Sequence, residues 1–417
     1  MWLTTFKQFL TLIKKNRFFT FVNLFGISFT IMLVMILQIS FESRVWPGGP
    51  EKTADKMLFL NRSVISKEKS MQLGGISNCV IKEYILNMKT PEKIGVISYS
   101  QWTYIGNNGV TDFVVKGTNA EFLSMFNYKM LEGRMYTKNE VSQSKDVIVI
   151  NRKVKEQFFG NDSAVGKTIE VQDKLFTVVG VVENVPVNCE TAYSDIWYPH
   201  TLFNEPLQLF NKTGRWAAVL YAANKTDFDE IKEEAAMIEK QVSAKTDGWV
   251  YKLGGPFDVL DNYLIGNIDP RMYVGKNISL LMLAGRMFFI LLIPALSLIA
   301  LNLTRVQERA EEIAVRKTFG ASSSSLIRQI LFENFMLTLI GGVIGLLMAW
   351  ISIQLFGDFL FAELSSPANG IVNVTLSLLT FLVCIIVSFI LSVMSGIIPA
   401  RRMAKLKPAL IMKGGEL

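Results

Sequence analysis

The sequence predicts a membrane protein with four transmembrane α-helices and a large extracytoplasmic α+β domain inserted between helices 1 and 2. Half of the 417 residues are hydrophobic, and the mean hydropathy is +0.32. Charged residues are absent from four long runs, at 18–41, 287–304, 334–357 and 364–400. Each run can cross a hydrocarbon core of about 30 Å at about 1.5 Å per residue, and we place the fourth helix at 374–398 of its run.

The distribution of Lys and Arg predicts how the helices are oriented. Together the segments 1–17, 305–333 and 399–417 hold 14 bases and 5 acids, whereas the short loop 358–373 has two acids and no base. Because basic segments stay in the cytoplasm, we expect both termini inside and residues 42–276 outside. The net charge of +7 then belongs to the inner segments. The outer domain has no charge excess, so we expect no nucleic-acid partner.

The first uncharged run begins the membrane part of the chain. It is too long for the apolar region of a cleavable signal peptide, and no typical cleavage site follows it. We therefore interpret it as a signal anchor. Segment 277–304 is expected to contain a stalk followed by the second transmembrane helix.

The outer segment alternates between strand and helix patterns. Asn151 is the expected N-cap of one of the helices, because its side chain can accept a hydrogen bond from the first helical turn. Interleaved strands and helices indicate an α+β domain, which we divide into two subdomains. We expect strands at 57–65, 94–99, 111–116, 146–150 and 217–222, a hairpin at 168–171 and 176–182, and helices at 80–88, 120–126, 152–159 and 227–242.

Small residues line one face of the third transmembrane helix. Such residues let helix backbones approach closely in lipid, where no hydrophobic gain drives association. The pattern is compatible with packing inside one chain and with packing against a second protomer. No ionisable residue lies in the middle of a span, which argues against an ion pathway. The predicted helix-packing residues are Gly341, Gly342, Gly345 and Ala349 in the third helix, and Ser388 and Ser392 in the fourth.

We find no catalytic, cofactor-binding or metal-binding constellation in the sequence. The segment from Gly160 to Thr168 resembles a phosphate-binding loop, but five residues rather than four separate its glycines, and it follows a helix. We therefore expect a turn there. His200 is the single histidine and has no cluster of partner groups, so we assign it a structural role. Cys79 and Cys189 are expected as buried small residues, with a disulfide as the alternative.

The polar bridge between the second and third spans carries an unusual mixture of charges. Its first part continues the second span as a helix, Gly320 ends that helix, and Ser322 and Ser323 can cap a new helix that runs into the third span. We interpret this elbow as a docking surface joined to two spans, with a solvated connector as the alternative. The predicted coupling residues are Arg305, Glu308, Arg309, Glu311, Glu312, Ile313, Arg316, Lys317, Gly320 and Ala321.

Several motifs in fixed order resemble the MacB/FtsX-type ABC transporter permeases. They include the run 311–321, Gly341-Gly342-Val-Ile-Gly345 and the closing segment 399–410. In the outer domain, Val115-Lys-Gly117 and the hairpin at 166–182 are similar to the periplasmic core domain of that family. The resemblance departs at Ala314, where the family often has glycine.

The resemblance implies a bacterial inner-membrane protein whose large domain lies in the periplasm. It implies pairing with a second permease copy or paralogue. It also implies that separate ATP-binding subunits, which use ATP-Mg, dock at the elbow. The chain itself would bind no cofactor and would not be an enzyme. A membrane-fusion protein and membrane lipid are further implied partners.

Two functions follow from the resemblance and stay open at this point. In the first, ATP-driven closure of the partner subunits moves the periplasmic domain for efflux or extraction of an antibiotic, peptide or lipoprotein. In the second, the chain is an FtsX-like transmembrane regulator that activates a cell-wall hydrolase.

Overall fold

The computed structural model describes residues 17–45, 48–68, 70–106, 109–171, 174–203, 213–246, 248–266 and 322–360, with isolated positions between 277 and 319 and between 382 and 390. The chain forms two compact units. The helical unit comprises Met1–Phe41, Asn277–Leu360 and Val374–Leu417. The sheet unit comprises Glu42–Lys276 and Phe361–Asn373.

Two long helices dominate the described part of the helical unit. They are α2, Arg17–Val45, and α11, Ser323–Leu360. Each contains a stretch long and apolar enough to cross a membrane, over Thr20–Ser43 and Phe335–Phe356. The other two predicted spans, 287–304 and 374–398, lie outside the continuously described residues.

Helix α11 begins where the sequence predicts a cap. The Ser325 amide donates to the Ser322 hydroxyl at 3.3 Å, so Ser322 satisfies one of the free amides of the first turn. The helix then continues to Leu360, with one non-helical residue at Phe356. The predicted continuity from the end of the elbow into the third span is therefore confirmed.

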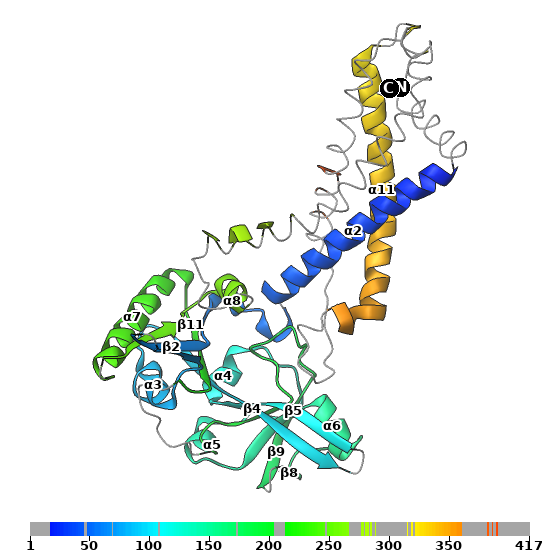
Figure 1. Cartoon of the computed structure of the whole chain (residues 1–417). Helices are drawn as coiled ribbons and strands as arrows, with labels where there is room; N and C mark the ends of the chain where they lie inside the picture. The colour runs from blue at the N-terminus through cyan, green and yellow to red at the C-terminus, as the bar shows by residue number, and fades with distance from the viewer. Residues whose placement is uncertain are drawn as a thin grey trace. The chain divides into compact units, whose positions relative to one another are not determined.

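The small-residue face of α11 packs against α2 within the same chain, where the two helices cross (Figure 1). A Cβ added at Gly341 would lie 2.5 Å from Ile27 Cγ2, and one at Gly345 would lie 2.7 Å from the Ser28 carbonyl oxygen. Real Cβ atoms do not approach other atoms this closely, so only glycine permits the observed backbone separation. Ala349 is fully buried on the same face.

Polar side chains in this packed region satisfy their hydrogen bonds locally. The Ser28 hydroxyl donates to the Leu24 carbonyl at 2.7 Å, and the Thr30 hydroxyl donates to the Gly26 carbonyl at 2.8 Å. Because these bonds stay within α2, neither hydroxyl requires water or a partner helix. The surface offered to α11 is therefore shaped by van der Waals contact.

The sheet unit is built on a nine-stranded mixed sheet in the order β1-β11-β4-β5-β10-β7-β9-β6, with β8 paired to β9. A second sheet has the order β12-β2-β3. The strands are β1 Met57–Leu60, β2 Arg62–Lys67, β3 Ser70–Gly74, β4 Lys93–Gly106, β5 Gly109–Thr118, β6 Met130–Gly133, β7 Val147–Asn151, β8 Thr168–Val171, β9 Lys174–Val182, β10 Ile196–Pro199, β11 Trp216–Tyr221 and β12 Val250–Gly254.

Helices cover the sheets at both ends of the unit. Figure 1 shows α3 and α7 beside β2 and β11, and α6 at the other end beyond β5. The α-helices are α3 Asn78–Glu83, α4 Ala120–Met125, α5 Lys138–Ser142, α6 Arg152–Phe159, α7 Phe228–Ala244 and α8 Val259–Gly266. Short 3-10 helices are η1 Gly49–Glu51, η2 Ala54–Lys56, η3 Ile85–Asn87 and η4 Lys225–Asp227.

Alternate residues of the large sheet build three cores on its two faces. In β11, Ala217 and Val219 belong to the first core, whereas Trp216, Ala218 and Leu220 belong to the second. In β7, neighbouring residues alternate in the same way between the first core and the third. One face thus carries a single core along its length, and the opposite face carries two, one at each end.

The predicted elements of this unit are largely present, with shifted bounds. Helix α6 begins after Asn151, whose side chain accepts from the Val154 amide at 2.9 Å as predicted. The predicted hairpin is β8 and β9. The predicted strand 57–65 divides at Asn61 into β1 and β2, which belong to different sheets. The buried strand β10, which contains Tyr198 and Pro199, is not among the predicted strands.

The two described cysteines do not form a disulfide. Cys79 and Cys189 are both buried, in the thiol form. Cys79 lies in the second core, and Cys189 lies in the first, on the opposite face of the large sheet. The expectation of two buried small residues is confirmed for these positions.

The packing of α2 against α11 predicts different outcomes for the same substitution one turn apart. Gly345→Ala should weaken the contact by roughly 1–3 kcal/mol, because the new methyl group overlaps the Ser28 carbonyl. Gly342→Ala should be tolerated, since a Cβ there would lie 3.9 Å from Ile31 Cδ1.

The measurement is crosslinking between Met32→Cys and Ser352→Cys by a short thiol reagent, in a chain carrying Cys384→Ser. The Ser352 hydroxyl and the Met32 sulfur are 3.5 Å apart. We expect an intrachain crosslink whose yield falls for Gly345→Ala and not for Gly342→Ala. A crosslink formed between chains would contradict the intrachain packing.

Candidate functional site

Most residues of the predicted coupling elbow and fourth span lie outside the described residues. The affected predictions concern Arg305, Glu308, Arg309, Glu311, Glu312, Ile313, Arg316, Lys317, Gly320, Ala321, Ser388 and Ser392. The four predicted packing residues of the third span are described, and all are buried: Gly341, Gly342, Gly345 and Ala349.

The segment that resembles a phosphate-binding loop is a turn between a helix and a strand. Gly160 caps the end of α6 with φ +59°, and Gly166 adopts φ +83° just before β8. The Lys167 ammonium lies 3.0 Å from the Asp162 carboxylate in the same turn. The glycines therefore serve backbone conformations that other residues rarely adopt, and the lysine is ion-paired locally.

A short loop at residues 188–192, here called the anchor loop, contacts the end of α2. The Asn188 amide nitrogen donates to the Ser43 carbonyl at 3.2 Å. Ser43 lies in the last turn of α2, where carbonyls have no partner within the helix. Asn188 is only 2% exposed, so this bond is shielded from water.

Two buried charged side chains hold the rest of the anchor loop. The Lys116 ammonium on β5 donates to the carbonyls of Glu190 at 2.7 Å and Thr191 at 2.9 Å. The Glu51 carboxylate at the end of η1 accepts from the Ala192 amide at 2.7 Å. The end of α2, the end of η1 and strand β5 are thereby all bonded to one loop.

Burial shifts the ionisation of both charged groups toward neutrality. Removal from water raises the pKa of Glu51 from 4.5 to about 7, and it lowers the pKa of Lys116 from 10.5 to about 8. Each charge partly offsets the shift of the other. The Lys116 ammonium also lies 5.4 Å from the centre of the Tyr99 ring. Each side chain is held by backbone groups of the anchor loop, so removal of one charge leaves the hydrogen bonds of the other in place.

One residue in the sequence, Lys116, could have indicated this buried polar cluster. Lys116 interrupts the apolar alternation of β5, and a lysine inside a buried strand requires partners. Glu51 gave no such signal, because it stands in a polar segment of the chain. The partners of Lys116 are backbone carbonyls, which no side-chain pattern could identify.

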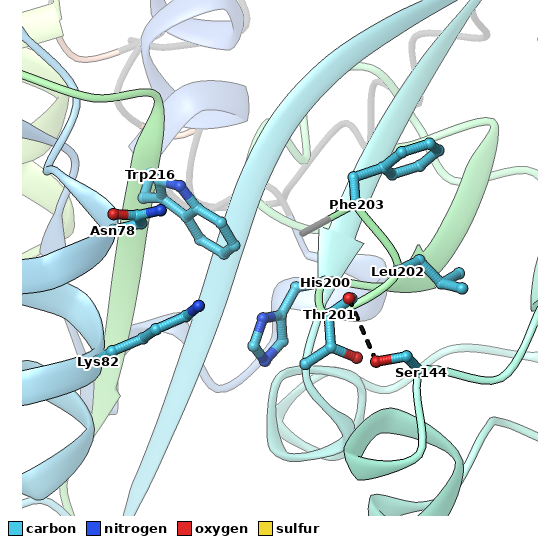
Figure 2. Close-up of a pocket in the computed structure, with 8 residues that line it drawn as sticks. All are labelled: Asn78, Lys82, Ser144, His200, Thr201, Leu202, Phe203 and Trp216. Carbon is cyan, nitrogen blue, oxygen red and sulfur yellow. Dashed lines mark hydrogen bonds between the residues drawn. The ribbon is translucent and has the colours of Figure 1, made fainter. Parts of the chain in front are cut away.

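The sheet unit also contains a cavity of about 360 Å³ (Figure 2). It lies on the face of the large sheet that carries two cores, because its walls come from both. Trp216 belongs to the second core, and Leu202 and Phe203 pack against the third. The full lining is Asn78, Lys82, Ser144, His200, Thr201, Leu202, Phe203 and Trp216.

His200 stands at the centre of this cavity, immediately after β10. Its amide donates to the Thr118 carbonyl at 3.0 Å, which extends the pairing of β10 with β5 by one residue. Burial, followed by the charge of Lys82, lowers the pKa of His200 to about 4. The imidazole is therefore uncharged at neutral pH. Sequence reasoning gave His200 a structural role and did not identify the cavity.

The buried carboxyl group predicts a specific pH dependence of stability. Glu51 titrates near 4.5 when unfolded and near 7 when folded, so a rise in pH through this range ionises the unfolded state first. Folding stability due to this group is then lost progressively, by about 3 kcal/mol in total. Glu51→Gln keeps an acceptor for the Ala192 amide and has no proton to lose.

The measurement is thermal unfolding of the full chain between pH 4.5 and 8. Relative to wild type, Glu51→Gln should gain stability steadily across the range from 4.5 to 7. Glu156→Gln, at an exposed position on α6, is the matched control and should follow the wild-type profile. Parallel profiles for wild type and Glu51→Gln would count against a raised pKa.

Comparison with known proteins identifies two successive domains. Residues 59–238 match the model of the MacB-like periplasmic core domain, and residues 286–408 match that of the FtsX-like permease C-terminal domain. Together the two matches cover more than half of the chain.

Curated relatives agree with both matches. The macrolide export ATP-binding/permease protein MacB of Pasteurella multocida is 25% identical over 309 residues, which are 73% of this chain and 44% of that protein. The pyoverdine export ATP-binding/permease protein PvdT of Pseudomonas entomophila is 24% identical over 402 residues, 94% of this chain and 57% of that protein. YknZ of Bacillus subtilis, named as an uncharacterized ABC transporter permease, is 25% identical over 304 residues, 72% of this chain and 69% of that protein.

The chain spans about half the length of the ATP-binding/permease relatives. Among solved structures, the periplasmic region of MacB from Actinobacillus actinomycetemcomitans aligns with 50% of this chain and 94% of its own, at 17% identity and a TM-score of 0.34. With a MacB-like periplasmic core domain followed by an FtsX-like permease domain, the chain belongs to the MacB/FtsX-type ABC transporter permeases.

Proposed function

We propose that this chain is a transport permease that converts ATP-driven closure of partner subunits into movement of its periplasmic domain. The movement would serve efflux or extraction of an antibiotic, peptide or lipoprotein on the outer side of the inner membrane. The observation that carries the proposal is the succession of a MacB-like periplasmic core domain and an FtsX-like permease domain on one chain.

The names of the relatives favour export over regulation of a cell-wall hydrolase. MacB and PvdT are named for export of macrolides and pyoverdine, and both names include an ATP-binding part. We infer that ATP-Mg is bound and hydrolysed by an ATP-binding subunit that docks at the elbow 305–321. The permease itself would then carry out no chemistry.

Helix α11 supports transmission from the elbow into the membrane part. It is helical from Ser323 onward, directly after the predicted docking surface, and its Gly341 and Gly345 lie in contact with α2. At these two glycines the helix backbones are in close contact, so a shift of α11 toward α2 must either move α2 or separate the two helices. We infer that α2 is the element that carries the movement onward.

The anchor loop supports transmission at the other end of α2. Ser43 of α2 accepts a hydrogen bond from Asn188, and the same loop is bonded to Lys116 on β5 and to Glu51. A displacement of Ser43 would therefore act on a strand of the large sheet through buried hydrogen bonds. Association with a second permease copy belongs to the same proposal, because the family resemblance implies a pair.

The docking of an ATP-binding subunit predicts the effect of charge reversal in the elbow. The double change Glu312→Lys and Arg316→Glu should weaken co-purification of the ATP-binding subunit. Each reversed side chain would then face a charge of its own sign on that subunit. Either single change should have little effect, since exposed ion pairs contribute only about 0–1 kcal/mol.

The matched control is the double reversal Asp229→Lys and Lys232→Asp on α7, whose side chains form an exposed pair at 4.0 Å. It should leave co-purification and ATP-dependent activity unchanged. If the elbow variant also retains both, with normal membrane insertion, the elbow is a connector and the docking proposal fails.

The proposed topology predicts which introduced cysteines react from outside the cell. Lys153→Cys, at the start of α6, should react with a membrane-impermeant thiol reagent in spheroplasts. Lys413→Cys should react only after the membrane is permeabilised. Cys79 and Cys189 are buried, so the parent chain supplies the background level. Labelling of Lys413→Cys from outside would exclude the topology.

A further inference from the structure

The cavity around His200 occupies the junction between the two cores that share one face of the large sheet. Its lining comes from α3, from Ser144 after α5, from residues 200–203 after β10 and from the start of β11. A volume of about 360 Å³ lies within the range of small-molecule sites. The cavity is therefore large enough for an organic ligand and too large to be a simple packing defect.

One wall of the cavity is positively charged. Figure 2 shows the Lys82 side chain extending from α3 toward His200. Among the residues that the structure describes, the Lys82 ammonium forms no ion pair. Glu121, whose charge raises the pKa of His200, is itself paired with Lys138 at 2.6 Å. The charge of Lys82 is thus available to an anionic ligand.

The imidazole of His200 lines the cavity and supplies a hydrogen-bonding group. Its Nδ1 is buried, has no hydrogen-bond partner within the described part of the chain and is closed to solvent. A ligand would therefore reach the ring through Nε2, from which the neutral imidazole can donate a hydrogen bond to a carboxylate beside Lys82.

The remaining lining combines the apolar side chains of Leu202, Phe203 and Trp216 with the polar Asn78, Ser144 and Thr201. Trp216 presents its indole ring to the cavity and contacts the His200 ring edge to face, with centroids 5.6 Å apart. Phe203 is held by edge contacts with Trp102 at 5.9 Å and Tyr198 at 5.3 Å. Rings fixed in this way favour a flat apolar body over a strongly polar one.

We propose that this cavity is a ligand site of the periplasmic domain for a small organic carboxylate with an aromatic or apolar body. The carboxylate pairs with the Lys82 ammonium and accepts a hydrogen bond from Nε2 of the His200 imidazole. The body of the ligand lies between Trp216, Leu202 and Phe203. Binding at this site involves the periplasmic domain alone and does not depend on ATP hydrolysis or transport.

The test is calorimetric titration of the full chain in lipid nanodiscs with 3-phenylpropionate, and with the uncharged 3-phenylpropanamide in parallel. Empty nanodiscs supply the background. We expect saturable binding of the carboxylate, weakened at least about tenfold for the amide, because a charge-assisted hydrogen bond is lost. Absence of saturable binding of the carboxylate would overturn the proposal.

Three variants locate the binding. Lys82→Gln, at an exposed position, should weaken binding of 3-phenylpropionate at least about tenfold, and Leu202→Trp should abolish it by filling the cavity. Lys240→Gln removes an equally exposed lysine from α7 and should bind as wild type does. Thermal unfolding of each variant checks that it is folded.

The result for the variants decides between this cavity and other sites. Binding that survives both Lys82→Gln and Leu202→Trp would place the carboxylate elsewhere on the protein or in the lipid, and the proposal would be wrong. Because the titration measures no transport, a negative result leaves the proposed permease function untouched.

Discussion

Side chains alternate between the two faces of the nine-stranded sheet, and the rest of the sheet unit depends on this alternation. Central strands such as β7 and β11 are buried on both faces, so neighbouring residues of one strand enter different cores. A polar side chain in such a strand has no route to solvent and must find its partners inside. Lys116 on β5 therefore determines the position of the anchor loop, because the loop supplies the carbonyls that make its burial tolerable.

Local signals in the sequence predicted individual elements well and their assembly poorly. Asn151 and the apolar periodicity after it located α6, since a cap and a helix face are properties of adjacent residues. The strand β10 was missed, since it is short and ends in a proline. Proline is tolerated there because it is the last residue of the strand, where the loss of one amide donor matters least. The first predicted strand, 57–65, is extended as predicted, but its division between two sheets was not predicted.

The candidate functional features also differ in whether the local sequence could predict them. The small-residue face of α11 was visible in the sequence, because glycine spacing reports how closely a backbone can be approached. The sequence could not say what approaches it, and the contact with Ile27 and Ser28 of α2 emerges only from the fold. The cavity was invisible for a related reason. Lys82, Ser144, His200 and Trp216 come from segments that the sheet order brings together, and no local pattern links them.

The contact between α2 and α11 depends on close packing, whereas the anchor loop depends on directional hydrogen bonds. This difference suits the proposed transmission of movement. The contact of α2 with α11 is mostly apolar and fits closely at the glycines, so it resists compression, but van der Waals contacts and one weak hydrogen bond to the Met32 sulfur give little resistance to sliding. Hydrogen bonds at the anchor loop are directional, and the two carbonyls bound by Lys116 fix the loop relative to β5 in orientation as well as distance. An apolar substitute of similar volume could match the stability of the buried pair. It could not resist a sideways pull on the loop, because apolar contacts re-form after a small displacement and these bonds do not.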